Sequence, residues 1–303
     1  MEFLQWLETI RFPVMDDFML AITNLGDEIA LLVVALVFFW CIDKRKCYYI
    51  MSIGFVGTIV NQFMKLLFQI PRPWVRDPSF TAVEAAKESA GGYSFPSGHS
   101  QNSVGIFGGI AAIEKNKFIR ILSIIICVLV PFSRMYLGVH TPADIFVGAA
   151  MAIALIFILK PLIFGFDGKL IPYVLGFMTA LAVAYLCFIE FFPFPEDIDP
   201  HNLASGTKNA YTFIGALTGF CVVYFVDTKW LKFPVNAVWW VQVIKVVVGF
   251  VLVLALKEGL SKPLSDLLTE YPGRMVRYFL MVIVAGIVWP LTFRWFSTIG
   301  KKR

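Results

Sequence analysis

Three short groups of polar residues, spaced along an otherwise apolar chain, have the types needed to bind and transfer a phosphoryl group. Their members are Lys65 and Arg72 in KLLFQIPRP, Ser97, Gly98 and His99 in SFPSGHS, and Arg134, His140 and Asp144 in SRMYLGVHTPAD. In such a set, cations and amides hold the phosphate oxygens, one histidine attacks phosphorus, and the other protonates the leaving group. No carboxylate cluster of metal-ligand type accompanies them in the sequence, so this chemistry requires no metal ion or other cofactor.

The first two groups also admit plain structural roles. Arg72 precedes Pro73, which pushes it toward extended geometry just beyond an apolar run. Ser97 is a natural N-cap, and Gly98 lets the backbone approach an anion at a helix N-terminus. Taken singly, Lys65 is a snorkelling lysine, Arg72 a headgroup contact and Ser97 a simple cap. Their occurrence together favours a phosphate site.

The third group predicts a helix start that also carries a catalytic pair. Thr141 is the expected N-cap, Pro142 the first helical residue and Asp144 the acid of a capping box. That role explains Asp144 completely, yet the same position lets its carboxylate reach His140. A carboxylate on one ring nitrogen fixes the tautomer and leaves the other nitrogen as nucleophile or base.

The elements that hold these groups must be membrane helices. The 303 residues are 58% hydrophobic and 16% charged, with a mean hydropathy of +0.76, whereas soluble domains are nearer half apolar and a quarter charged. This composition argues against a soluble enzyme, a disordered protein and a nucleic-acid binder. The net charge of +5 suits basic cytoplasmic loops. The five cysteines lie in or beside apolar runs and are interpreted as buried hydrophobes without disulfides.

The apolar runs predict an all-α integral membrane protein with about nine transmembrane helices, since each crossing takes about 20 residues. The expected spans are residues 28–42, 47–67, 99–113, 119–138, 142–164, 171–192, 209–227, 239–257 and 277–297. Residues 1–27 lack the basic start of a signal peptide, and Phe3, Leu4, Trp6, Leu7 and Ile10 recur at helical spacing. We expect this segment to lie in the membrane interface.

Basic residues orient the bundle, because cytoplasmic loops are enriched in lysine and arginine. With nine spans, one side receives Lys44, Arg45, Lys46, Lys115, Lys117, Arg120, Lys160, Lys169, Lys229, Lys232, Lys301, Lys302 and Arg303. The N-terminus is then outside, the C-terminus is cytoplasmic, and residues 68–98, 134–141 and 193–208 are outside. The site is expected on this non-cytoplasmic face. The stretch from Lys257 to Arg277, with four basic residues, is the main contrary signal.

The three groups resemble the signature motifs of the type 2 phosphatidic acid phosphatase (PAP2) superfamily. The motifs K-x6-RP, PSGH and SR-x5-H-x3-D are complete here and occur in the family's order. The resemblance implies that His140 is a nucleophile forming a phosphohistidine, that Asp144 orients it, and that His99 is the general acid. It further implies that the phosphate is held by Lys65, Arg72, Ser97, Gly98 and Arg134.

The resemblance covers residues 28–192, which would form a six-helix catalytic core without Mg²⁺. Residues 193–303 would be a three-helix C-terminal membrane extension that the motifs leave unexplained. A membrane lipid carrying a phosphate or pyrophosphate is the expected substrate, with phosphatidate, phosphatidylglycerophosphate, a sphingoid phosphate and a polyprenyl pyrophosphate as candidates. The oligomeric state is unknown from the sequence.

Three other functions stay open at this point. A nine-helix layout also resembles glucose-6-phosphatase, which acts on a soluble phosphate ester. An acceptor hydroxyl in place of water would make the protein a lipid phosphotransferase. A transporter or binding protein with a retained phosphate site is the non-enzyme alternative, although it needs neither a nucleophile nor an acid.

Some polar residues outside the motifs carry weaker expectations. The loop 77–94 is interpreted as a mobile external segment in which Tyr93 and Lys87 touch a substrate headgroup. His201 is expected to be a solvated loop residue. Lys245 interrupts an apolar run, and the nearby Trp239 and Trp240 favour a lysine that snorkels to the interface.

Overall fold

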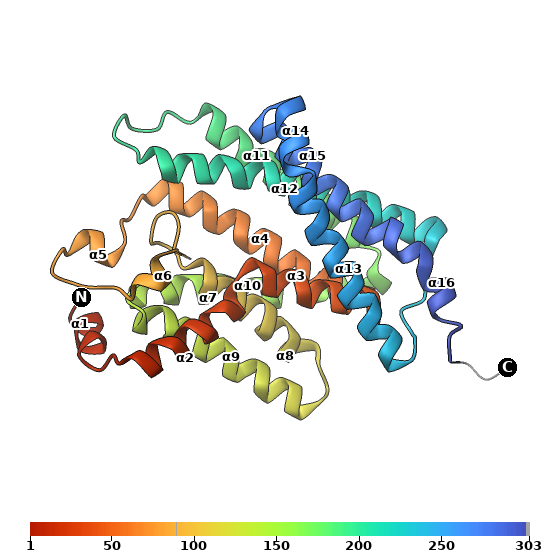
Figure 1. Ribbon diagram of the computed structural model, residues 1–303, viewed down its shortest axis with the longest axis horizontal. Coiled ribbons are helices and arrows are strands. Elements are labelled where there is room, and N and C mark those ends of the chain that lie inside the picture. The colour runs from red at the N-terminus through yellow and green to blue at the C-terminus, as the bar shows by residue number, and fades with distance from the viewer. Residues whose placement is uncertain (89, 301–303) are drawn as a thin grey trace. The chain divides into compact units, whose positions relative to one another are not determined.

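The described chain consists of helices and their connections (Figure 1). The computed structural model describes residues 1–88 and 90–300, and within them 81% of the chain is helical and no strand occurs. The helices are α1 (Glu2–Thr9), α2 (Pro13–Thr23), α3 (Glu28–Val37), α4 (Lys44–Phe68), α5 (Pro73–Arg76), α6 (Glu84–Glu88), α7 (Gly98–Ser103), α8 (Gly109–Ile113), α9 (Lys117–Tyr136), α10 (Pro142–Phe164), α11 (Ile171–Phe191), α12 (Pro200–Val226), α13 (Trp239–Gly259), α14 (Ser261–Leu268), α15 (Glu270–Ile283) and α16 (Phe293–Phe296).

Long apolar helices confirm the predicted all-α membrane protein. Within the described residues, seven helices are long and apolar enough to cross a membrane, and a pair bent by 53°, Pro13–Gly26 with Glu28–Ile42, raises the number to eight if it is one span. The seven are Lys44–Arg76, Lys117–Tyr136, Pro142–Phe164, Ile171–Phe191, Pro200–Leu231, Trp239–Leu268 and Glu270–Phe296. The number nine stays a prediction, because the expected span 99–113 is a helix shorter than the about 20 residues of a full crossing.

One compact unit contains all eight candidate site residues. It comprises Met1–Leu31, Ile53–Pro161 and Pro193–Gly206. Within it, α2 and α7 pack on α9, and α7 continues through a π-helical turn, Val104–Gly108, into α8. The long helix α9 therefore contacts both the N-terminal segment and the segment that carries the SGH residues.

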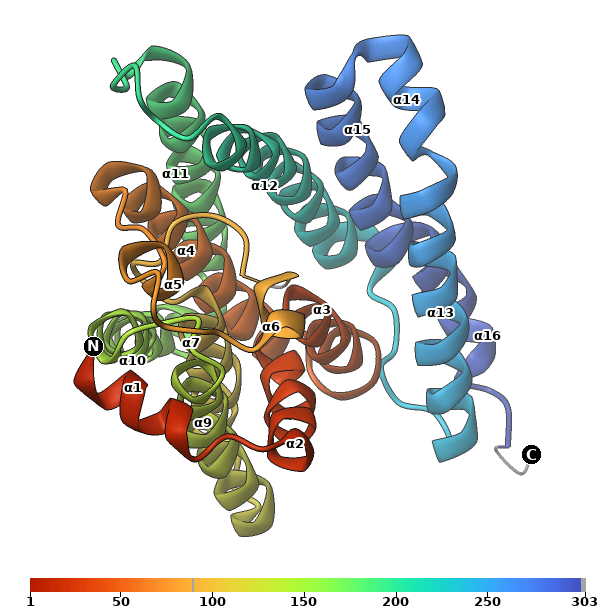
Figure 2. The same cartoon turned by 60° about the vertical axis from the view of Figure 1, so that its left-hand side comes forward.

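Within this unit, the N-terminal helices α1 and α2 pack against α9 (Figure 2). On α1, Leu4 and Leu7 are buried beside Phe80, while Phe3 and Trp6 are exposed. This amphipathic pattern is typical of a helix at an apolar boundary. The assignment of residues 1–27 to the interface, and the division into residues 28–192 and 193–303, stay predictions.

Several residues of the loop 77–94, for which mobility stays a prediction, are packed against other parts of the unit. Ala82, Ala86 and Ala90 are buried in a cluster with Tyr136 and Leu137. The Val83 amide donates to the carbonyl of Leu137 at 3.0 Å. These contacts place the residues before the SGH group against the end of α9.

The second compact unit comprises Leu32–Ser52, Leu162–Phe192 and Thr207–Arg303, of which Lys301, Lys302 and Arg303 lie outside the described residues. Here the expectation for Lys245 is wrong. Its side chain is 1% exposed, and Nζ donates to the carbonyls of Trp40 at 2.6 Å and Val235 at 3.0 Å and to Oε1 of Gln242 at 3.0 Å. Three acceptors match the three donors of an ammonium group, so the lysine stays inside the unit instead of reaching the interface.

Candidate active site

Lys65 and Arg72 occupy buried positions at the end of α4 and the start of α5. Each is 6% exposed. The Lys65 ammonium donates to the carbonyl of Tyr93. Arg72 is the N-cap of α5 with φ −65° and ψ 155°, the extended geometry expected before Pro73. Neither side chain is a snorkelling group or an exposed headgroup contact.

The guanidinium of Arg72 is held by the loop that precedes the SGH residues. Nη2 donates to the Gly91 carbonyl at 2.8 Å, and Nε donates to the Gly92 carbonyl at 3.0 Å. Nη1 donates to the Val139 carbonyl at 3.0 Å and lies 2.9 Å from Nε2 of His140. Backbone carbonyls thus fix the direction of this cation beside the histidine.

The contacts of His140 determine which ring nitrogen carries the proton. Arginine only donates hydrogen bonds, so the Nε2 atom facing Arg72 is the acceptor and carries the lone pair. The proton then lies on Nδ1, which is 3.4 Å from Oδ2 of Asp144. In this tautomer the lone pair of the ring lies on Nε2.

Asp144 performs the capping role and contacts the histidine at the same time. Its Oδ2 atom accepts from the Thr141 amide at 2.8 Å and from the Ser94 hydroxyl at 2.6 Å. The Asp144 amide donates back to Oγ1 of Thr141 at 3.4 Å, which completes the predicted capping box. The capping role and the contact with His140, both predicted from the sequence, are therefore compatible, because one carboxylate makes both sets of contacts.

His140 lies between the end of α9 at Tyr136 and the start of α10 at Pro142, with 1% of its surface exposed. Burial lowers its pKa well below the usual value, and the positive charges of Arg72, Lys65 and Arg134, together with His99, lower it further. The imidazole is therefore neutral, which is the protonation state that a nucleophile needs.

The SGH group is joined to the third group through the backbone. Ser97 is the N-cap of α7, as expected, and its hydroxyl oxygen accepts from the Ser100 amide at 3.4 Å. The Ser97 amide donates to the carbonyl of Asp144 at 3.0 Å. A Cβ on Gly148 would lie 2.5 Å from the Ser97 carbonyl oxygen, so α10 and α7 meet where only glycine fits.

Gly98 has more room than its neighbours in this motif. A Cβ there would lie 3.7 Å from Oδ1 of Asn61, an ordinary van der Waals contact. The protein's own packing therefore does not demand glycine at this position. The expectation that Gly98 allows close approach of a phosphate stays a prediction.

Two side chains near the site were not expected from the sequence. Oδ1 of Asp27 lies 2.7 Å from Nε2 of His99, and Oγ1 of Thr23 accepts from Nη1 of Arg134 at 2.9 Å. Both residues belong to the segment interpreted as interfacial. Asp27 lies just before the first expected span, on the membrane side where the three motifs were expected. This position is the sequence feature that could have identified it.

Residues expected at the edge of the site have other partners. The Tyr93 hydroxyl accepts from the Asp199 amide at 3.4 Å, and Lys87 pairs with Glu84 at 2.7 Å. His201 is exposed, as expected. Tyr93 and Lys87 therefore have partners within the protein, and a headgroup contact for either stays a prediction.

Two family models match the chain in separate stretches. The PAP2 superfamily model matches residues 45–166, and the model for the transmembrane extension of PAP2 superfamily phosphatases matches residues 211–302. Phosphatidylglycerophosphatase B of Bacillus subtilis (strain 168) is 30% identical over 175 residues, which cover 53% of this chain and 79% of that protein. The chain belongs to the PAP2 superfamily.

Other relatives of this PAP2 protein bear related names. Undecaprenyl-diphosphatase BcrC of Bacillus subtilis (strain 168) is 31% identical over 163 residues, covering 53% of this chain and 79% of that protein. Lipid A 4'-phosphatase of Bacteroides thetaiotaomicron is 26% identical over 139 residues, covering 44% and 56%. A crystal structure of a PAP2-type phosphatidylglycerolphosphate phosphatase from Bacillus subtilis is 28% identical and covers 55% of this chain and 84% of that one, with a TM-score of 0.45.

The sequence-based resemblance is therefore confirmed at the level of the family. This PAP2 protein is an integral membrane phosphatase that acts on lipid phosphates. The expected C-terminal extension coincides in large part with the residues matched by the transmembrane-extension model.

Proposed function

We propose that the protein hydrolyses a lipid phosphate or lipid pyrophosphate through a phosphohistidine on His140. The main support is the geometry of this residue, with Nδ1 toward Asp144 at 3.4 Å and Nε2 toward Arg72 at 2.9 Å. A buried neutral histidine that presents a lone pair toward a cation is suited to attack a bound phosphate.

The first step transfers the phosphoryl group to the protein. When a phosphate enters, Nη1 of Arg72 turns from Nε2 to a phosphate oxygen and releases the lone pair. His140 then forms a P–N bond as the bond from phosphorus to the leaving oxygen breaks, and His99 gives its proton to that oxygen. Lys65, Arg72 and Arg134 hold the phosphate oxygens together with Ser97 and the Gly98 amide.

The second step restores the enzyme. A water oxygen attacks phosphorus, the P–N bond breaks, and the electron pair returns to Nε2 of His140. His99 takes the proton from the water, and inorganic phosphate leaves. Asp144 remains ionised throughout and keeps the imidazole oriented.

The substrate class follows from the relatives and from the membrane setting. The names of the relatives refer to phosphatidylglycerophosphate, undecaprenyl diphosphate and lipid A. A lipid in the bilayer reaches the ends of α9 and α10 without leaving the membrane. We therefore favour phosphatidylglycerophosphate and a polyprenyl pyrophosphate, with phosphatidate and a sphingoid phosphate as further candidates.

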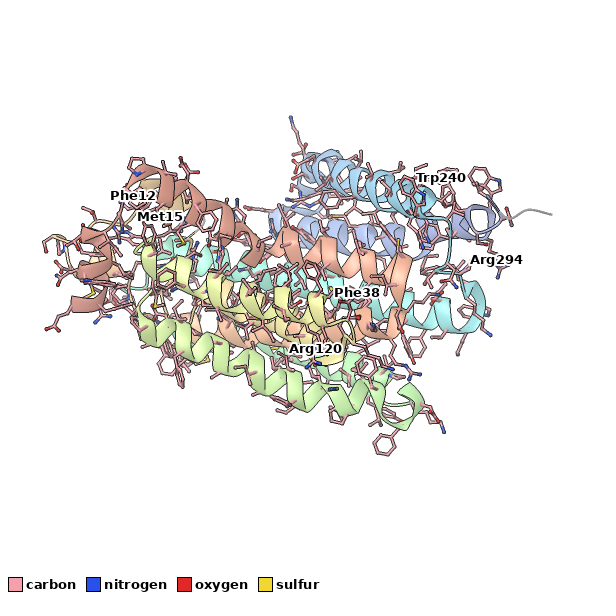
Figure 3. The ribbon with its side chains drawn as sticks, turned by 90° about the horizontal axis from the view of Figure 1, so that it is seen from below. Phe12, Met15, Phe38, Arg120, Trp240 and Arg294 are labelled. Carbon is pink, nitrogen blue, oxygen red and sulfur yellow. The ribbon has the colours of Figure 1, made fainter. Side chains whose placement is uncertain are left out.

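The placement of charge within the first unit supports a site on the non-cytoplasmic face. Lys117 begins α9 and Arg134 lies in its last turn, and a helix of 20 residues is about 30 Å long. On α10, Asp144 is in the first turn and Lys160 is near the other end. Figure 3 shows Arg120 well away from Phe12 and Met15 of the N-terminal segment. Since basic residues mark the cytoplasmic side, the site faces the opposite one.

The test is phosphate release by the purified protein in mixed micelles containing EDTA. The substrates are the four lipid classes and glucose 6-phosphate, and the blank is His140→Ala. The expected result is turnover of at least one lipid, none of glucose 6-phosphate, and a phosphohistidine that is trapped only when His140 is present. The EDTA arm tests the expectation that no metal ion is required.

Other outcomes would redirect the assignment. Turnover of glucose 6-phosphate would move the protein to the branch that uses soluble esters. Products that form only when an acceptor lipid is added would identify a phosphotransferase. Equal activity of His140→Ala and the wild type would refute the phosphohistidine mechanism.

A further inference from the structure

An acidic residue outside the three motifs contacts one of the two site histidines. Oδ1 of Asp27 lies 2.7 Å from Nε2 of His99. The side chain of His99 is 14% exposed and that of Asp27 is 35% exposed, so the contact is partly shielded from water. A carboxylate this close both orients an imidazole and stabilises its protonated form.

The turn that carries Asp27 is built for close approach to α7. A Cβ on Gly26 would lie 3.0 Å from the His99 carbonyl oxygen and 2.8 Å from Cγ1 of Val130. The Gly26 carbonyl also accepts from Nδ2 of Asn102 at 3.5 Å. Glycine therefore allows the turn to seat the next residue, Asp27, against His99.

A second contact docks the same segment at the site. Thr23 is 1% exposed, and its hydroxyl accepts from Nη1 of Arg134 at 2.9 Å. One segment thus contacts a phosphate-binding cation and a histidine, each from a different motif. The contact of Asp27 with His99 is therefore one of several contacts that hold this segment at the site, and not an isolated surface pair.

The charges around His99 oppose one another. Burial lowers the pKa of His99 to about 4, and the positive charges of Arg134 and Arg72 contribute to this lowering, whereas Asp27 opposes it. The general acid must carry a proton before it can protonate a leaving oxygen. The carboxylate of Asp27 therefore offsets part of the effect of burial and of the two arginines.

We propose that Asp27 is a positioning residue for His99, orienting the imidazole and favouring its protonated form for transfer to the leaving oxygen. This inference rests on the proposed role of His99 as the general acid. During the transfer the proton passes from His99 to the leaving oxygen, and Asp27 stays ionised. In the second step Asp27 stabilises the imidazolium that forms when His99 takes a proton from water.

The experiment compares leaving groups that differ in their need for a proton. The probes are an alkyl phosphate and an aryl phosphate with the same hydrocarbon chain, in micelles, and the variant is Asp27→Asn. Because kcat/KM covers formation of the phosphohistidine, it falls about tenfold or more for the alkyl phosphate, the effect of removing the carboxylate that lies 2.7 Å from Nε2. It falls much less for the aryl phosphate, whose oxygen leaves readily without a proton.

The pH profile supplies a readout that a merely structural role would not move. In Asp27→Asn, the two arginines act on His99 unopposed, so the basic limb of kcat/KM for the alkyl phosphate moves to lower pH. Asp27→Glu restores the limb in part because it restores the charge. The matched control is Asp17→Asn, which removes an exposed carboxylate of α2 and leaves both probes unchanged.

The opposite result is equally clear. Equal losses on both probes, with the basic limb unmoved, would reduce Asp27 to a structural residue and overturn the proposal. If Asp27→Asn does not yield folded protein, Asp27→Ser takes its place. The loss of kcat/KM for the alkyl phosphate is then compared with the loss for the aryl phosphate in the same way. Failure of the proposed function itself is separate, since it shows as the absence of a phosphohistidine on wild-type protein.

Discussion

The guanidinium of Arg72 donates a 2.9 Å hydrogen bond to Nε2 of His140, while backbone carbonyls hold its other nitrogens. This contact shows which ring nitrogen bears the lone pair, and it places an arginine cation directly beside that nitrogen. A cation that is already oriented before substrate arrives needs little rearrangement during the reaction.

The first prediction concerns that arginine. Arg72→Lys retains the charge but loses the planar set of donors that spans His140 and the three carbonyls. We expect kcat/KM to fall about a hundredfold, in line with the loss of one oriented donor at a reacting group. The control is Arg76→Lys, an exposed position on the same short helix, which is expected to be neutral. A neutral Arg72→Lys variant would show that a point charge suffices.

A second prediction separates nucleophile from orienting residue. His140→Ala is expected to abolish turnover, because no other group supplies the lone pair. Asp144→Asn is expected to lower kcat by about a hundredfold while leaving the fold intact, since an amide oxygen in the place of Oδ2 still caps Thr141 but lacks the negative charge beside His140. Measurement of phosphate release and circular dichroism on both variants checks this. Equal loss of activity in the two variants would contradict the distinction.

The third prediction is a pH dependence. Burial and the neighbouring cations lower the pKa of His140, so the neutral nucleophile persists below the usual histidine pKa of about 6.5. The acidic limb of kcat/KM therefore lies at lower pH than for an ordinary histidine. Lys65→Met removes one of these positive charges, so the pKa of His140 rises and the limb moves to higher pH. A limb that moves downward or stays in place would show that Lys65 does not act on His140.

Fourth, the close approach of α10 to α7 is testable with a single methyl group. Gly148→Ala places a Cβ 2.5 Å from the Ser97 carbonyl oxygen. The two helices must move apart, which costs about 1–3 kcal/mol and displaces Ser97 from Asp144. We expect a lower unfolding temperature in detergent and a loss of activity larger than that loss of stability explains. Gly176→Ala, where a Cβ meets nothing within 4 Å, is the control.

The fifth prediction concerns the second unit. Lys245→Met removes the ammonium donor from the carbonyls of Trp40 and Val235 and from Oε1 of Gln242. The Val235 carbonyl keeps a hydrogen bond from Nε2 of Gln242 at 2.9 Å, and each buried group left unsatisfied costs about 1–3 kcal/mol. A drop in unfolding temperature is expected in detergent, whereas Lys229→Met, at an exposed position, has little effect. An unchanged unfolding temperature for Lys245→Met would mean that water replaces the ammonium at these carbonyls.

Local features of the site could be predicted from the sequence because neighbouring residues determine them. Pro73 alone makes Arg72 extended, and Ser97 caps α7 with an amide three residues away. The capping box of Thr141 and Asp144 is likewise a contact between residues three positions apart. The apolar runs similarly required membrane helices, since seven of the described helices are long and apolar enough to cross a bilayer.

Contacts between distant parts of the chain were decided only by the tertiary structure. Thr23 and Arg134 are separated by 111 positions, and Lys245 and Trp40 by 205. The contact of Asp27 with His99 belongs to the same class, and it depends on how the N-terminal segment packs beside α7 and α9. Sequence periodicity shows which face of a helix is apolar, but it does not show which helix covers that face. The motif residues were therefore found from the sequence, and the residues that position them required the packed fold.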